Sequence, residues 1–436
     1  MNSVTFDILE KTKNFIMEQE SNTAYRTDPC RFTRTKKLSF KATVVLVLQK
    51  LHKSLSLEVV HFFEKLAHHS ATVAQSVSKS AFVQRRQGIK ASFFQDLLYF
   101  FNQQYQHHPQ VTPPRWKGFR LLACDTSVIE LPASEELKAV YEHEVGAGHF
   151  RTQGRLSALY QVGHAMFLDA QLAPTTTDER SLAIQHWPHC QADDLIIYDR
   201  GYPSYDFMYR HQQAGIAFVM RVPIVFNKVT NAFLASGKLS ATVNFYPRRQ
   251  DFQELPYQKD TPLAVRLIRV ELPNGETELL ATSLLDNKAY PTEDFAHLYA
   301  LRWQEEVRFD VLKSNLGLEN FSGYSVLSVE QDLYAALFLL NLQALVSQEV
   351  SSQVKENCQH RQHDYQVNQA LSLGFLKERV IDLFYSQQSE ELIASLKMLF
   401  IQHVEPVRAD RRPDRNPKKY KKKKKPKIIM NRKPVL

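Results

Sequence analysis

The sequence of 436 residues is poor in glycine: 13 glycines make up about 3% of the chain, against a usual share of about 7%. Neither G-x-x-x-x-G-K-[ST] nor G-x-G-x-x-G occurs in it. These two loops are the usual cradles for the phosphates of ATP and of dinucleotides. We therefore expect a protein that uses no nucleotide cofactor.

Cysteine is also scarce, with four residues in the whole chain, and no two of them form a C-x-x-C pair. This spacing argues against a disulfide framework and against a zinc ribbon, and it fits a reducing compartment. Two mixed clusters, at residues 186–190 and 358–363, contain histidine and cysteine but lack a second half at the usual spacing of zinc ligands. No G-x-S-x-G motif of a serine hydrolase is present.

Long hydrophobic runs are missing as well. Residues 1–7 contain no basic segment leading into an apolar one, so no secretory signal is predicted. The most apolar run, 333–346, contains Asn341 and Gln343 and falls short of the roughly 18 uninterrupted apolar residues of a membrane span. We expect a cytoplasmic protein without a membrane anchor.

The charge that is present lies in three zones. The net charge of +9 divides into +7 over residues 1–110, −10 over 111–406 and +12 over 407–436. Two basic terminal segments around an acidic central segment are typical of a protein that binds a polyanion, so nucleic acid is the expected partner. The last zone, with its run Lys421–Lys425, cannot bury enough apolar surface to fold, and we predict a disordered basic tail.

The N-terminal zone is helical in pattern, with apolar residues at helical spacing over 40–52 and 57–68. Ser78 can cap a third helix that carries Lys79, Arg85 and Arg86. The arrangement resembles a helix-turn-helix, in which these three basic residues would contact DNA. A plain helical bundle with a basic outer face fits the same pattern.

Two buried strands of the following zone end on acidic residues. Residues 119–124 are predicted as a strand that stops at Asp125, and 195–198 as one that stops at Asp199. Aspartate also ends strands without any catalytic role.

Further strands and helices surround these two. Residues 156–172 are predicted as two strands, and a helix follows with Asp178 and Glu179 in its first turn, where the helix dipole favours acidic residues. A second helix over 204–214 and a strand over 216–222 complete the order. This order of elements, which is three strands, helix, strand, helix, strand, predicts a mixed α/β sheet.

Residues 224–290 are predicted as a β-rich insertion, because two strand patterns flank the turn Pro273-Asn274-Gly275. A helical pattern returns at Thr292 and continues past Gly317. Within it, four polar residues fall inside one arc of about 60° at about 100° per residue: Tyr299, Arg302, Glu306 and Lys313. The arc borders an apolar face, which suits the lip of a site. A solvated face with an Arg302–Glu306 pair is the alternative.

Asp125, Asp199 and Glu306 together would supply three carboxylates. Such an oxygen cluster can hold two Mg²⁺ or Mn²⁺ ions about 4 Å apart. Two ions in that arrangement activate a water or a 3′-hydroxyl and stabilise the leaving oxygen of an in-line displacement at phosphorus.

The motifs around these residues resemble the DDE transposases of bacterial insertion sequences, specifically insertion-sequence family four. They are Cys-Asp-Thr-Ser at Asp125, Tyr-Asp-Arg-Gly-Tyr at Asp199, and Y-(2)-R-(3)-E-(6)-K from Tyr299 to Lys313. The resemblance spans roughly residues 118–325 and implies a ribonuclease-H-like mixed-sheet core, interrupted by a β-rich insertion and accompanied by helical N-terminal and C-terminal regions.

The resemblance also implies roles. Asp125, Asp199 and Glu306 would be the catalytic, metal-binding triad, while Tyr299, Arg302 and Lys313 would contact DNA near the cleaved phosphate. Trp303 resembles an aromatic residue that stacks on a flipped-out base. Glu305 precedes Glu306, and a small change of register would exchange the two; spacing and arc favour Glu306.

These observations predict six segments. They are a helical, DNA-binding domain (1–110), the first part of the catalytic core (111–223), the β-rich insertion (224–290), the catalytic helix (291–325), a helical C-terminal region (326–406) and the basic tail (407–436). The predicted function is that of a transposase that cleaves the ends of its own element and joins the 3′-hydroxyls to target DNA. Its partners would be double-stranded DNA, both the terminal inverted repeats and the target, and a second copy in a homodimer on paired ends, in the bacterial cytoplasm at the nucleoid. A metal-dependent nuclease on the same core and a non-catalytic DNA-binding descendant remain as alternatives.

Overall fold

The computed structural model describes residues 3–33, 37–50, 53–69, 76–146, 148–247, 257–258, 260–272 and 275–407, apart from the side chains of Trp303, Glu305 and Glu306. These residues form two compact units. The helical unit draws on 1–111, 130–140 and 311–436, and the sheet unit on 112–129 and 141–310. The helical unit thus combines the N-terminal zone with the C-terminal helices.

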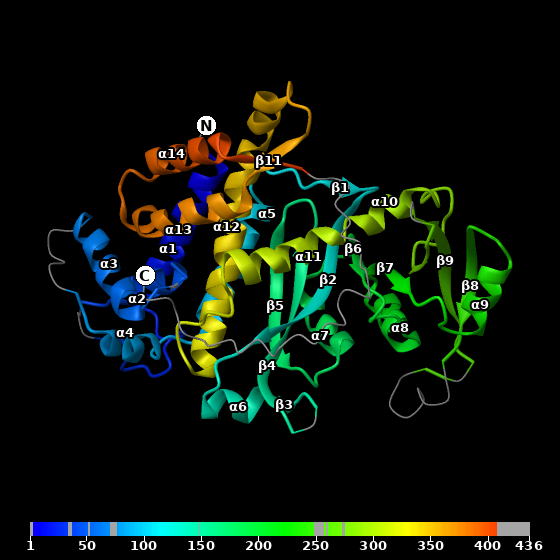
Figure 1. The fold of residues 1–436 in the computed structure, drawn as a ribbon, viewed down its shortest axis with the longest axis horizontal. Helices are drawn as coiled ribbons and strands as arrows, with labels where there is room; N and C mark the ends of the chain where they lie inside the picture. The colour runs from blue at the N-terminus through cyan, green and yellow to red at the C-terminus, as the bar shows by residue number, and fades with distance from the viewer. Residues whose placement is uncertain are drawn as a thin grey trace. The chain divides into compact units, whose positions relative to one another are not determined.

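The helical unit is built from elements of both chain ends (Figure 1). They are α1 (Val4–Glu18), α2 (Phe40–Leu48), α3 (Leu55–Ala67), α4 (Lys79–Arg86), α5 (Ala91–Gln106), α6 (Glu135–Tyr141), the π-helical turn η3 (Val311–Asn315), α12 (Val326–Cys358), β11 (Tyr365–Val367), α13 (Gln369–Tyr385), α14 (Ser389–Gln402) and β12 (Val404–Pro406).

The long helix α12 is the core of this unit and packs against α1, α2, α5, α13 and α14. Among the described residues it is the one helix long and apolar enough to cross a membrane, yet 83% of its most apolar window is buried inside the protein. The polar residues in that window are satisfied there: Asn341 donates to Asn102 at 2.8 Å and Gln343 donates to Ser372 at 2.9 Å. Because buried polar groups need such partners, α12 has the character of a core helix.

The sheet unit contains the remaining elements. They are β1 (Arg115–Trp116), β2 (Phe119–Glu130), β3 (Glu142–Glu144), β4 (Phe150–Gln161), β5 (Met166–Pro174), α7 (Glu179–Gln185), the 3₁₀ turn η1 (Trp187–His189), β6 (Asp194–Tyr198), α8 (Tyr205–Ala214), β7 (Ala217–Val222), α9 (Lys228–Ala235), β8 (Ser240–Phe245), β9 (Leu263–Glu271), β10 (Thr277–Thr282), α10 (Asp294–Ala300) and α11 (Trp303–Asp310).

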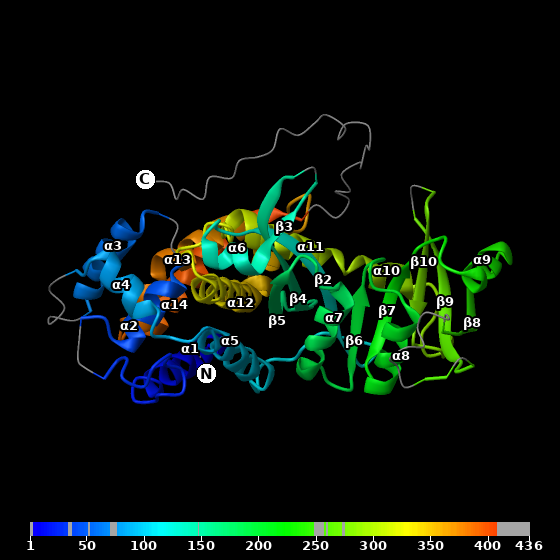
Figure 2. The same cartoon turned by 90° about the horizontal axis from the view of Figure 1, so that it is seen from below.

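One large mixed sheet forms this unit, in the order β3-β4-β2-β6-β7-β10-β9-β8, with β1 paired to β2 and β5 paired to β4. Strands β2, β6 and β7 are parallel, and β5, β8, β9 and β10 pair antiparallel to their neighbours. Figure 2 shows β6, β7, β10, β9 and β8 in a row. The mixed α/β sheet predicted above is confirmed, whereas the ribonuclease-H-like assignment stays a prediction.

Residues 224–290, predicted as a β-rich insertion, contain α9 and the strands β8, β9 and β10, which continue the main sheet through pairing of β10 with β7. The predicted hairpin is present, since Glu271 of β9 pairs with Thr277 of β10. Gly275 between them has a φ of 81°, a left-handed conformation that glycine adopts without strain.

Two details of the prediction are wrong. Strand β2 does not stop at Asp125 but runs on to Glu130; what ends there is its pairing with β6, whose last partners are Cys124 and Tyr198. The helix predicted from Thr292 past Gly317 is also interrupted. Short i→i+3 bonds, from the Arg302 amide to the Tyr299 carbonyl at 3.1 Å and from Gln304 to Leu301 at 3.1 Å, tighten the chain between α10 and α11.

Candidate active site at the paired ends of β2 and β6

Asp125 and Asp199 come next to each other because of the register of two parallel strands. Cys124 of β2 pairs with Tyr198, the last residue of β6. Asp125 is the next residue of β2, and Asp199 directly follows β6. Neighbouring strands lie about 4.8 Å apart, and residues in register point to the same face. The sheet therefore brings the two carboxylates together from positions 74 residues apart in the sequence.

The end of α10 and the turn after it supply a donor to each carboxylate. The Tyr299 hydroxyl donates to Oδ1 of Asp199 at 3.3 Å, and Nη1 of Arg302 donates to Oδ2 of Asp125 at 3.3 Å. The Thr126 amide donates to Oδ1 of Asp125 at 2.8 Å. Because Tyr299 and Arg302 are three residues apart, they project from one turn and can reach both strands.

The donors are buried, whereas the carboxylates are partly open to solvent. Arg302 is 3% exposed and Tyr299 is 4% exposed, while the Asp125 side chain keeps 22% of its surface accessible. Burial raises the pKa of Tyr299 well above its ordinary value, so the hydroxyl stays protonated and acts as a donor. The arrangement presents two oriented carboxylates at the surface of a rigid support.

Four of the predicted site residues therefore meet in the sheet unit: Asp125, Asp199, Tyr299 and Arg302. Glu306 and Trp303 lie on α11, and the predictions for their side chains, like that for Glu305, fall outside the described part of the structure. Lys313 lies on η3, in the helical unit. The single continuous helix predicted to carry these residues is wrong, because α10, α11 and η3 are separate elements; the arc of their side chains stays a prediction.

The two aspartates fit a hard divalent cation. Carboxylate oxygens are the ligands that Mg²⁺ and Mn²⁺ prefer, and Asp125 and Asp199 directly follow the paired residues Cys124 and Tyr198. Among the described side chains no three His, Cys, Asp or Glu residues are close enough to hold an ion. The donor set for a metal would thus be Asp125 and Asp199 with Glu306 as the predicted third ligand.

Glu179 is a further carboxylate near the site. The sequence pattern predicts only that it lies in the first turn of a helix. Its Oε1 accepts a hydrogen bond from the Thr126 hydroxyl at 3.0 Å and pairs with Nη1 of Arg155. Thr126 directly follows Asp125, so Glu179 contacts the residue next to a candidate metal ligand. An acidic residue in the first turn of a helix gave no indication of this contact.

The three basic residues predicted to contact DNA differ in exposure. Lys79 is exposed. Arg85 is half-buried, donates to the Leu38 carbonyl at 2.8 Å and lies 3.8 Å above the ring of Phe32. Arg86 is only 4% exposed. The helix start predicted at Ser78 is confirmed, since its hydroxyl accepts from the Ala81 amide at 3.2 Å.

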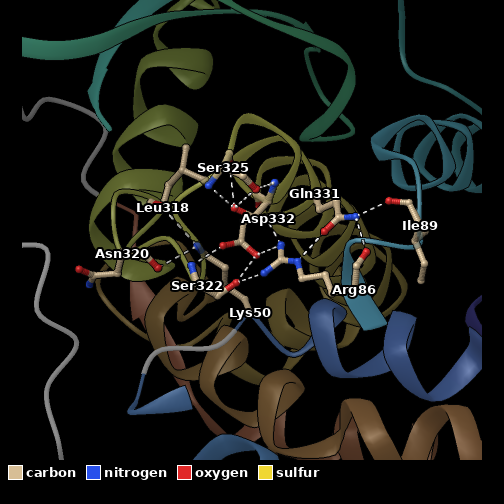
Figure 3. Close-up of polar contacts among 10 residues, drawn as sticks. Lys50, Arg86, Ile89, Leu318, Asn320, Ser322, Ser325, Gln331 and Asp332 are labelled. Carbon is tan, nitrogen blue, oxygen red and sulfur yellow. Dashed lines mark hydrogen bonds and ion pairs between the residues drawn. The ribbon is translucent and has the colours of Figure 1, made fainter. Parts of the chain in front are cut away.

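Arg86 is committed to contacts inside the helical unit (Figure 3). It forms an ion pair with Asp332 at 2.7 Å and donates to the Ser328 carbonyl at 2.8 Å, and it also donates to the side chains of Gln331 and Ser322. We therefore withdraw Arg86 from the predicted DNA contacts, because a buried guanidinium with these partners does not face a duplex. The predicted basic tail, from residue 408 on, lies outside the described residues.

Comparison with known proteins identifies the class. The family described as "Transposase DDE domain" matches residues 116–342, just over half of the chain, and the chain therefore belongs to this family of DDE transposases. The match includes both aspartates and the turn that carries Tyr299 and Arg302. No curated protein matches the sequence.

A solved structure described as "Cryo-EM structure of piggyBac transposase synaptic complex with hairpin DNA" is similar over 95% of this chain and 87% of that chain, with 10% identity and a TM-score of 0.45.

Proposed function

We propose that the protein is a metal-dependent transposase of insertion-sequence family four, which cleaves the ends of its own mobile element and joins the freed 3′-hydroxyls to target DNA. The observation that carries the proposal is the pair Asp125 and Asp199, which directly follow the last paired residues of the parallel strands β2 and β6, inside the segment that matches the DDE transposase family. The order β5-β4-β2-β6-β7, with β2, β6 and β7 parallel, supports a ribonuclease-H-like core for it.

In this proposal Asp125, Asp199 and Glu306 hold two Mg²⁺ or Mn²⁺ ions. When bound, such ions polarise the phosphate, activate the attacking oxygen and neutralise charge at the leaving oxygen. Tyr299 fixes the rotamer of Asp199 through its hydroxyl, and Arg302 balances the charge of Asp125. Both functions keep the carboxylates in a single orientation, which lowers the reorganisation needed for catalysis.

The DNA contacts of the proposal divide between the units. By the resemblance, four residues would lie near the cleaved phosphate, with Trp303 stacking on an unpaired base: Tyr299, Arg302, Trp303 and Lys313. Because Tyr299 and Arg302 are 4% and 3% exposed, they would act there through Asp199 and Asp125 and not by direct contact with DNA. Lys79 is the most accessible of the predicted N-terminal contacts, and Arg85 could reach a phosphate only with the part of its guanidinium that Phe32 leaves open. We further propose a homodimer that holds two terminal inverted repeats in the bacterial cytoplasm, at the nucleoid.

The test uses purified full-length protein and a duplex that carries one end of the element, identified from inverted repeats in the DNA flanking the gene. With Mg²⁺ we expect cleavage at the end and joined products with a target duplex, and neither with EDTA. Cleavage without joined products would support the nuclease instead. Binding with neither reaction would support a non-catalytic DNA-binding protein.

Two adjacent glutamates on α11 provide a matched pair of variants. Glu306→Gln should reduce cleavage at saturating DNA by at least about 100-fold, the scale of losing a principal electrostatic group in an active site. Glu305→Gln makes the same chemical change one residue away and should leave cleavage within a few-fold of wild type. The reverse result would assign the third carboxylate to Glu305.

A further inference from the structure

Glu179 connects several elements around the candidate site. It begins α7, pairs with Arg155 of β4 and accepts from Thr126 of β2. Arg155 also donates to the Thr175 carbonyl at 3.0 Å, just beyond β5, and its Nε is buried without a hydrogen-bond partner among the described residues. The Glu179 carboxylate is therefore the principal counter-charge of a guanidinium that is 20% exposed.

The link to Asp125 runs through one residue. The Thr126 hydroxyl is held by Oε1 of Glu179 at 3.0 Å, while the Thr126 amide donates to Oδ1 of Asp125 at 2.8 Å. Asp125 thus has one oxygen fixed by Thr126 and the other contacted by Arg302 at 3.3 Å. Replacing Glu179 would remove the acceptor of the Thr126 hydroxyl, on the same residue whose amide donates to Asp125.

The second carboxylate oxygen of Glu179 faces the loop after the other strand. A Cβ built on Gly201 would lie 3.0 Å from Oε2 of Glu179, so the carboxylate fills the space where a side chain at position 201, two residues after Asp199, would begin. One side chain therefore accepts a hydrogen bond beside Asp125 and lies near the backbone beside Asp199. A side chain at position 201 would require the Glu179 carboxylate to shift.

We propose that Glu179, acting through Thr126 and against Gly201, is a positioning residue that sets the spacing and orientation of the Asp125 and Asp199 carboxylates for metal binding. It is not offered as a metal ligand, because no group of three carboxylate, imidazole or thiol ligands forms among the described side chains. Residues that orient metal ligands in this way change metal affinity or activity by about 10- to 100-fold when replaced. The inference rests on the proposed function.

The experiment titrates Mn²⁺ alone into the full-length protein by isothermal calorimetry, without DNA, and then measures the Mg²⁺ concentration for half-maximal cleavage. We expect Glu179→Ala and Thr126→Val each to weaken Mn²⁺ affinity by about 10-fold or more. Thr126→Ser, which keeps the hydroxyl, should restore it. The double variant Glu179→Ala with Thr126→Val should be no weaker than Glu179→Ala, because both changes break one connection.

Asp206→Ala is the matched control. Asp206 also lies in the first turn of a helix, α8, and pairs with Arg210 at 2.9 Å with similar exposure, so its loss should leave Mn²⁺ affinity within twofold of wild type. The inference would be overturned if Glu179→Ala and Thr126→Val both bound Mn²⁺ with wild-type affinity. If Glu179→Ala then also had a lowered melting temperature, the role of Glu179 would be purely structural.

The same titration separates this inference from the proposed function. The double variant Asp125→Asn with Asp199→Asn should lose Mn²⁺ binding. If it binds like wild type, the metal site proposed here is misplaced and both proposals fail. If it loses binding while Glu179→Ala and Thr126→Val bind normally, the proposed site stands and the positioning role of Glu179 is refuted.

Discussion

Replacing Arg86 by Met should destabilise the helical unit strongly. Arg86 and Asp332 are 4% and 2% exposed, so the substitution leaves a buried carboxylate without the guanidinium that pairs with it. Breaking a buried ion pair from one side costs about 3–5 kcal/mol. The loss is large because the same guanidinium also donates to the Ser328 carbonyl and to the Gln331 side chain.

Hydrogen exchange of the backbone amides is the suitable assay, because it reads the stability of α4 and α12 separately from the sheet unit. A loss of 3–5 kcal/mol corresponds to an opening equilibrium that is roughly 150- to 4,000-fold more populated, at 1.4 kcal/mol per factor of ten. Lys65→Met is the control. It breaks an ion pair with Glu378, whose side chain is 77% exposed, and exposed pairs contribute at most about 1 kcal/mol.

A second variant tests the electrostatic reasoning. Adding Asp332→Leu to Arg86→Met removes the carboxylate that has lost its guanidinium and should recover part of the lost protection, since apolar replacement of a whole buried pair is often tolerated. Wild-type exchange in Arg86→Met, together with a selective loss of DNA affinity, would refute the structural role. That result would return Arg86 to the DNA contacts.

Three further changes have defined outcomes. Tyr299→Phe removes a hydrogen bond to Asp199, worth about 1.5–3 kcal/mol for a charged acceptor, and should slow cleavage roughly 10- to 150-fold. The control Tyr209→Phe, at a tyrosine of α8 that packs against Tyr205 and Tyr257, should change the rate less than twofold. Equal rates for both variants would contradict the role of the Tyr299 hydroxyl. Burial lowers the pKa of His211 to about 3, below the value of about 6.5 in the unfolded chain, so its contribution to stability is complete above pH 6.5 and is lost as the pH falls toward 3. The free energy of unfolding should therefore fall by up to about 1.4 kcal/mol per pH unit below pH 6.5, more steeply than in His211→Gln, and parallel pH profiles would exclude this role. Deleting residues 408–436 should weaken binding to specific and random duplexes alike and flatten the plot of log K against log salt by about 0.9 for each lost phosphate contact, with an unchanged slope showing that the tail does not touch DNA.

The two strands that carry or precede the candidate aspartates could be predicted from the sequence, because local residue patterns determine them. Two short buried strands that each lead to an acid are visible as apolar runs followed by Asp125 and Asp199, and parallel pairing then places both acids at one edge. The extent of β2 past Asp125 was not predictable, because residues 126–130 lack an uninterrupted apolar run.

The features that could not be predicted depend on contacts between residues far apart in the sequence. Arg86 looks like a surface residue of a basic helix until Asp332, which is 246 positions away, is placed beside it. Glu179 looks like an ordinary first-turn acid until β2 brings Thr126 to it. The interruption at Arg302 is equally hidden, because no proline or glycine marks it and the tightened bonds of residues 299–304 depend on the tertiary position of the turn.

The most direct measurement of the central claim is the rate of Mg²⁺-dependent cleavage by Asp125→Asn and Asp199→Asn at saturating element-end DNA, with DNA affinity determined in parallel. We expect both variants to bind the duplex within a few-fold of wild type and to cleave at least about 100-fold more slowly, since each keeps its shape but loses the charge that the reaction requires. Cleavage at the wild-type rate in both variants would contradict the assignment of the paired ends of β2 and β6 as the active site.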